Sequence, residues 1–141
     1  MASLIYDSFW HDLARGNVDL DTDSFKLMLM TSTYAPSKSG HAKRSDLTNE
    51  VSGTGYTAGG AAVTVTLTAA SGNSDIELFN LANVSWSSAT ITARYGAVYK
   101  SRGGASSADE LCFLLDFGSD KTSTGGTFTV SMSSQFGVNN A

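Results

Sequence analysis

The chain opens with apolar residues that recur at helical spacing. Within residues 1–16 these are Leu4, Ile5, Phe9, Trp10 and Leu13. Residues three or four positions apart share one face of an α-helix, so the pattern predicts one short amphipathic N-terminal helix. Ser3 is placed to cap its start, and Gly16 its end, where a left-handed conformation costs glycine little. A helix this short is marginal alone, so we expect its apolar stripe to dock on the protein's own sheet or on a neighbour.

After residue 16 the pattern changes to the period of two that is typical of β-strands. Residues 25–31 are apolar on both faces, which predicts a central strand, whereas residues 61–68 alternate valine and leucine with threonine, as in a half-buried antiparallel strand. Further strand-like segments are residues 76–81, 84–86, 90–100, 110–117 and 127–133. The separators with turn-forming residues are 71–73, 101–105 and 118–126.

This order of elements predicts the fold class. Six or seven strands at roughly 10- to 15-residue spacing, with no helices between them, indicate a mainly β protein. We expect an antiparallel β-sandwich or jelly-roll-like single domain over residues 1–141. Residues 32–60 form a long loop insertion, in which residues 45–50 could make one helical turn. A connection of about 30 residues inside a compact domain is commonly functional or ordered by a partner.

Composition removes several classes of function. The formal net charge is −4, which disfavours direct binding of nucleic acid because phosphate contacts need clustered Lys and Arg. Cys112 is the single cysteine, so no internal disulfide forms, and its apolar surroundings predict an inert core thiol. No apolar run approaches the length of a membrane span, and the opening residues lack the features of a secretory signal. We therefore expect synthesis in a reducing cytoplasm.

Three features resemble sites of known chemistry without completing them. Residues 19–23 read Asp-Leu-Asp-Thr-Asp, but Ser24 and Met30 stand where a calcium loop needs glycine and glutamate, so we expect a polar turn. The glycine-rich residues 53–60 precede a strand rather than a helix, so they predict a structural loop and not a dinucleotide site. The two histidines do not lie at metal-ligand spacing. The sequence therefore predicts no metal and no cofactor.

Catalysis is not predicted either, because no nucleophile has a recognisable base or elbow context. Two pairs of carboxylates border expected turns and are expected to be solvated: Asp75 with Glu77, and Asp109 with Glu110. A small basic and aromatic cluster lies near a strand end: Tyr95, Tyr99, Lys100 and Arg102. It is either a solvated hairpin end or a contact for a sugar or an acidic partner.

Three stretches are distinctive when taken together: residues 47–60, LTNEVSGTGYTAGG; residues 89–100, ATITARYGAVYK; and residues 109–111, DEL, leading into LDFG at 115–118. They resemble a family of small virion proteins of tailed bacteriophages. With the opening helix and residues 19–23, the resemblance covers nearly the whole chain. It implies a capsid decoration, or cement, protein in many copies on the outer surface of the head, where it bridges neighbouring major capsid proteins. It also implies a homo-oligomer without catalytic residues.

The resemblance marks no contact residues, so the candidates come from this sequence alone. The helix offers Leu4, Ile5, Phe9, Trp10 and Leu13, the long loop offers Tyr34, Lys38, Lys43, Arg44 and Tyr56, and the hairpin end offers Tyr99 and Arg102. The helix stripe could equally cap the protein's own core, and the loop could be plain surface. If the loop makes the contact, deletion of residues 37–44 should leave a folded protein that binds shells poorly.

Two other functions remain open at this point. The first is a phage tail or fibre component, which would use a similar β-rich fold in another part of the virion. The second is a carbohydrate-binding module, in which Trp86, Tyr95 and Tyr99 would form a stacking platform for sugars.

Overall fold

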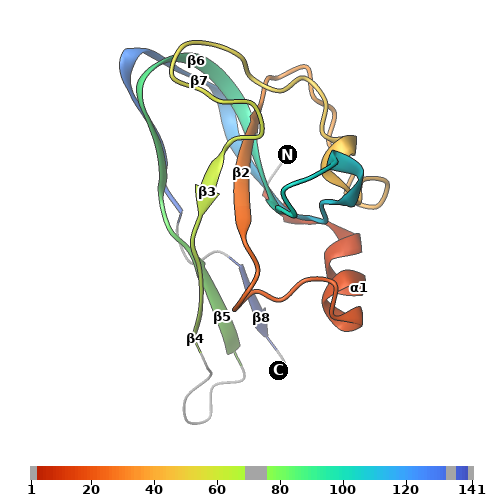
Figure 1. Cartoon of the computed structure of the whole chain (residues 1–141). Coiled ribbons are helices and arrows are strands. Elements are labelled where there is room, and N and C mark those ends of the chain that lie inside the picture. The colour runs from red at the N-terminus through yellow and green to blue at the C-terminus, as the bar shows by residue number, and fades with distance from the viewer. Residues whose placement is uncertain (1–2, 69–75, 133–135, 140–141) are drawn as a thin grey trace.

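The computed structural model describes residues 3–68, 76–132 and 136–139 as two antiparallel β-sheets with one α-helix (Figure 1). The elements are β1 (Leu4–Ile5), α1 (Asp7–Arg15), β2 (Phe25–Met30), η1 (Arg44–Asp46), β3 (Ala61–Val63), β4 (Val65–Thr68), β5 (Ile76–Leu81), β6 (Val84–Lys100), η2 (Ser106–Ala108), β7 (Leu111–Val130) and β8 (Phe136–Asn139). The larger sheet has the order β1-β7-β6-β2-β3 and the smaller β4-β5-β8. The expected mainly β, sandwich-like fold with one short helix is confirmed.

The N-terminal helix is shorter than the apolar spacing predicts. It begins at Asp7, because the two residues of β1 are extended and pair with β7. Ser3 is therefore no helix cap: its Oγ accepts a hydrogen bond from the main-chain N–H of Asp116, and the capping position falls on Tyr6 without a side-chain bond. The predicted C-terminal end is confirmed, since Gly16 takes φ 77° and closes the helix.

The prediction that β2 is a central strand is confirmed. It lies between β6 and β3, so both of its edges are paired. Phe25, Leu27 and Leu29 enter one hydrophobic core, while Met28 and Met30 enter a second core on the opposite face. A strand that is buried on both sides needs apolar residues on both faces, and β2 has them at every position except Lys26, which is only partly buried.

The two longest strands, β6 and β7, each span two segments that the sequence pattern predicts as separate strands. The predicted turn at residues 118–126 lies inside β7, and the predicted gap at residues 87–89 lies inside β6. Register explains the difference: Ala93 faces Lys121 and Tyr95 faces Asp116, so one residue of β6 stands opposite four of β7. Such bulges bend a strand without ending it. The β6–β7 ribbon accordingly arches over the rest of the molecule in Figure 1.

The strand expected at residues 61–68 divides between the two sheets. β3 pairs with β2 in the larger sheet, and β4 pairs with β5 in the smaller one. Val63 of β3 is buried, whereas the side chain of Leu67 of β4 is 44% exposed. The alternation is regular along the sequence, but the strand changes partners at Thr64. The expected turn at residues 71–73 and Asp75 lie outside the described residues, and the side chain of Glu77 does too.

The long connection between β2 and β3 packs against the sheet. Tyr34 and Leu47 are buried in the second core, and Met30 forms an isolated bridge with Glu50. Its single helical turn, η1, begins at Arg44 rather than at residue 45. The carbonyl of Ala42 accepts the N–H of Leu111, and the N–H of Arg44 donates to the carbonyl of Asp109. Deleting residues 37–44 would remove these bonds, so the structure favours loss of folded protein instead.

The glycine-rich residues 53–60 are a structural loop, as predicted. Glu50 holds this loop: its Oε1 accepts hydrogen bonds from the Tyr56 hydroxyl at 2.8 Å and from the Gly59 N–H at 2.6 Å. Gly60 has φ 83°, and a side chain there would meet the carbonyl oxygen of Leu27. The loop can therefore lie directly on β2 only because this position carries no Cβ.

We expect Gly60→Ala to lower the free energy of unfolding by at least about 2 kcal/mol, since alanine disfavours a positive φ and its Cβ meets main-chain atoms that cannot turn away. Urea unfolding at neutral pH measures the change. Gly103→Ala is the matched control, because Gly103 also has a positive φ but open space around its Cβ position. Equal losses in both variants would contradict the close-packing explanation and leave only the backbone preference.

Candidate functional site

The helix α1 presents two large apolar side chains to solvent. Trp10 is 41% exposed and Leu13 is 37% exposed. They lie three positions apart, so they share one face of the helix. We call these two residues the Trp10–Leu13 face. Exposed tryptophan is enriched among the residues that dominate protein–protein contacts, and Trp10 lies here beside a second exposed apolar side chain.

The adjoining side of α1 is anchored in the protein. Phe9 is fully buried, and its ring meets that of Phe113 edge-on at 4.8 Å between centroids. The carboxylate of buried Asp12 accepts a hydrogen bond from the Asn17 side chain at 3.1 Å, which fixes the turn after the helix. The ring of Trp10 also contacts that of Phe9 edge-on at 5.4 Å. The Trp10–Leu13 face is therefore presented by a helix that is fixed in place.

The predicted helix stripe thus separates into parts with different roles. Phe9 belongs to the first core and is removed from the candidate contact surface. Leu4 and Ile5 are half-buried in β1, where Leu4 packs against the second core and Ile5 against the first. Only Trp10 and Leu13 remain strongly exposed.

The candidates on the long loop are mostly engaged within the chain. Tyr34 is buried, and its hydroxyl lies 3.0 Å from the Tyr6 hydroxyl and 2.8 Å from His41 Nδ1. Tyr56 is half-buried, and its hydroxyl accepts the Leu29 N–H while donating to Glu50. These tyrosines are therefore internal hydrogen-bonding groups, and sequence reasoning missed Tyr6 because nothing along the chain marks its partner.

Lys38 is the most accessible cation of the loop. Its Nζ lies 3.0 Å from the Asp7 carboxylate, and both side chains are more than half exposed. The carbonyl of Lys38 also accepts the N–H of Asp7, so the loop is tied to the first turn of α1. This exposed ion pair adjoins the start of the helix that carries the Trp10–Leu13 face.

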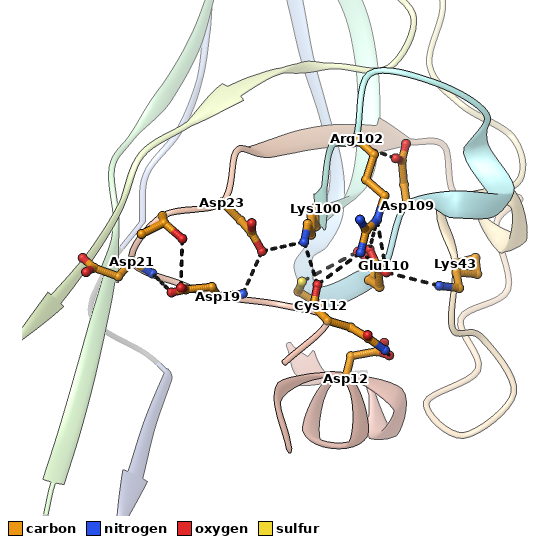
Figure 2. Close-up of polar contacts among 12 residues, drawn as sticks. Asp12, Asp19, Asp21, Asp23, Lys43, Lys100, Arg102, Asp109, Glu110 and Cys112 are labelled. Carbon is orange, nitrogen blue, oxygen red and sulfur yellow. Dashed lines mark hydrogen bonds and ion pairs between the residues drawn. The ribbon is translucent and has the colours of Figure 1, made fainter. Parts of the chain in front are cut away.

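Ion pairs to two buried carboxylates close the hairpin end between β6 and β7 (Figure 2). Arg102 binds Glu110 through two nitrogens, Nη2 at 2.7 Å and Nε at 2.9 Å, and Lys43 Nζ lies 3.5 Å from the same carboxylate. Arg44 Nε donates to Asp109 at 2.7 Å. Glu110 is 4% exposed and Asp109 is 1% exposed, so the expectation that this pair is solvated is wrong. Their burial was not predicted because two of their partners, Lys43 and Arg44, lie in the long loop and are distant in the chain.

The basic and aromatic cluster does not form a binding surface. Tyr99 is buried, donates its hydroxyl to the carbonyl of Gly59, and lies 5.2 Å beneath the Arg44 guanidinium. Lys100 pairs with Asp23 at 2.8 Å. Trp86 is also buried, so a platform of Trp86, Tyr95 and Tyr99 cannot offer its ring faces to a sugar. Arg102 and Lys43 keep partly exposed side chains but are paired with Glu110.

The polar turn and the buried cysteine behave as predicted. Residues 19–23 form a polar turn in which Asp19 accepts hydrogen bonds from Asp21 and Thr22. Cys112 is fully buried, and this burial raises the pKa of its thiol far above the ordinary value. Within residues 3–68, 76–132 and 136–139, no three side chains of the kinds that bind metals come together.

No family model, curated protein or solved structure matches this chain. Its function must therefore be argued from its own residues. In the described part of the chain, no helix is both long and apolar enough to traverse a lipid bilayer.

The buried carboxylates set the response to acid. Burial alone would raise the pKa of Glu110, but the hydrogen bonds from Arg102 and the charge of Lys43 outweigh it and hold that pKa below its usual range. The main-chain N–H groups of Ala42 and Lys43 likewise lower the pKa of Asp46. A carboxyl whose pKa is lower when folded stabilises the protein above its unfolded pKa, and this stabilisation is lost as pH falls through the folded pKa.

We therefore expect the free energy of unfolding to fall steadily between about pH 5 and pH 3, the range in which carboxyl groups titrate. Arg102→Ala should flatten this decline, because it brings the pKa of Glu110 closer to its unfolded value. Urea unfolding across this pH range measures both curves. Arg15→Ala is the control, since Arg15 is exposed in the last turn of α1. An equally steep decline in Arg102→Ala would contradict the role given to the Arg102–Glu110 pair.

Proposed function

We propose that this chain is a decoration, or cement, protein of a tailed bacteriophage, which binds the outer surface of the head in many copies and bridges major capsid proteins. The observation that carries the proposal is the Trp10–Leu13 face, an exposed apolar pair on a helix anchored through Phe9. The resemblance to small virion proteins of tailed phages supports it. The chain would reach the virion after synthesis in the host cytoplasm, act as a homo-oligomer, and catalyse no reaction.

The way in which the candidate contact surface is held suits this role. The long loop is fixed by ion pairs and main-chain bonds, and α1 is fixed by Phe9 and by the Lys38–Asp7 contact. A surface that is already ordered loses little conformational freedom when it binds, so more of the contact energy contributes to affinity. One exposed pair of residues is nevertheless a small contact.

Binding through many linked copies compensates for the small size of each contact. When copies are linked in an oligomer and the partner repeats over a shell, each contact after the first is effectively intramolecular, and affinity rises without new interactions. Because the bound copies favour the intact shell over a disrupted one, binding also stabilises the shell by linkage. Many weak contacts can thereby reinforce a capsid.

Immunogold labelling of virus particles that carry this chain tests the proposal. We expect label over the whole surface of the head and none on the tail. Label confined to the tail or its fibres would overturn the assignment to the head and support a tail component, which could use the same Trp10–Leu13 face. Particles without label would overturn both.

A further inference from the structure

One edge of β7 lacks a neighbouring strand over most of its length. β6 lies along its first edge, and β1 covers its second edge only at Leu114 and Phe113. Between Phe117 and Val130, no strand among the described residues pairs with that second edge. Main-chain N–H and C=O groups at an open edge are ready to pair with another extended segment.

A cavity of about 470 Å³ lies along this same edge. It lies between the two parts of β7 that precede and follow the bulge at residues 117–120. The bulge bends these parts toward each other, and the rings of Phe117 and Phe128 lie 6.5 Å apart. Ser3, at the start of β1, also lines it. The open edge and the cavity therefore form one groove, which we call the β7 groove.

The lining of the β7 groove combines apolar and polar groups. Leu115, Phe117, Phe128 and Val130 supply the apolar part, and serine and threonine side chains supply most of the rest. Two charged residues line it. Asp116 is paired with Arg94 at 3.0 Å, whereas Lys121 is exposed and makes no ion pair with a described residue. The charge that the groove offers to a ligand is therefore positive.

We propose that the β7 groove binds an extended polypeptide segment of a partner protein, which adds a short strand beside residues 127–130, places an apolar side chain in the cavity, and sets an acidic side chain against Lys121. A peptide is the ligand that matches an open strand edge, since it alone supplies a main chain in the same spacing. This inference does not depend on the proposed place of the chain on the phage head.

Two observations favour a short segment from another protein over edge pairing between two copies of this chain. β1 shows that this edge accepts an extended segment, because it pairs there over two residues, and Ser3, the residue before it, lines the groove. The bulge at residues 117–120, followed by the charged Lys121, interrupts the regular edge. Bulges and charges of this kind prevent long edge-to-edge pairing but leave room for a few residues.

Selection from a displayed library of random seven-residue peptides on the immobilised full chain tests the proposal. We expect enriched peptides that combine an aromatic or aliphatic residue with an acidic one. Thr127→Trp should fill the groove and weaken their binding at least about tenfold, as expected when a central contact is lost. Lys121→Glu should weaken it as well by reversing the charge. Thr124→Trp is the matched control, because Thr124 is exposed on the same strand but does not line the cavity.

Amide hydrogen exchange of the full chain supplies the second readout. A bound peptide that adds a strand should slow exchange within residues 127–130, whereas one that only sits in the cavity should not. The proposal is overturned if no peptide is enriched, if Thr127→Trp binds as well as the parent chain, or if exchange at residues 127–130 is unchanged. It is also overturned if peptides bind only a variant that lacks residues 1 and 2, since the groove would then belong to the chain's own N-terminus.

Discussion

Replacing Phe9 by alanine should lower the free energy of unfolding by about 3–5 kcal/mol, the loss that a buried aromatic ring in a core usually causes. Phe9 is fully buried, packs edge-on against Phe113 and belongs to the first core. Its removal leaves a cavity beneath α1 and takes away the ring contact that the helix makes with β7. Urea unfolding followed by circular dichroism at neutral pH measures the loss.

Trp10→Ala is the matched control for this prediction. Trp10 is the next residue of the same helix and another aromatic, but it is 41% exposed, so its ring packs less completely than that of Phe9. Its replacement should cost less than about 1 kcal/mol, as for most surface positions. Comparable losses in the two variants would contradict the division of the apolar stripe into a buried anchor and an exposed face.

The same Trp10→Ala variant should bind capsid shells much more weakly than the parent chain. A central tryptophan in a protein contact typically contributes about 2 kcal/mol or more, which corresponds to roughly thirtyfold in affinity. Under the proposed function each copy would bind through the same face, so the loss would be repeated at every contact that multivalency links. Co-sedimentation of the purified protein with shells of its own virus that lack it, over a range of concentrations, measures the affinity.

Leu67→Ala controls for a general loss of exposed apolar surface, because Leu67 is 44% exposed on β4, outside α1. This variant should bind shells as the parent chain does. If Leu67→Ala weakens binding while Trp10→Ala does not, the contact lies on the smaller sheet and the Trp10–Leu13 face has no part in it.

Most of the β-structure follows from the sequence because it depends on local periodicity. Apolar residues on both faces of β2 predicted burial on both faces, and the structure confirms it. The continuity of β7 could not be predicted from the same signal. Gly118 and Gly125 are turn-forming residues, yet they accommodate positive φ within a bent strand. Whether a glycine ends a strand or bends it depends on the register of the strand beside it.

The candidate site was predicted only in part for a similar reason. The stripe on the helix is visible in the sequence, but which residues it buries depends on where β7 lies, so Phe9 and Trp10 could not be distinguished. Tyr34 and Tyr99 read as accessible aromatic groups, whereas each is covered by a segment distant in the chain. Asp109 could not be seen as buried without its partner Arg44, which is 65 positions away.

The central claim is that this protein acts by binding a repeated protein surface. Its copy number per virus particle, measured against the major capsid protein in the same purified particles, tests this claim most directly. We predict a fixed ratio to the major capsid protein, with hundreds of copies in each particle. A handful of copies, or a number that follows the length of the tail, would contradict the account.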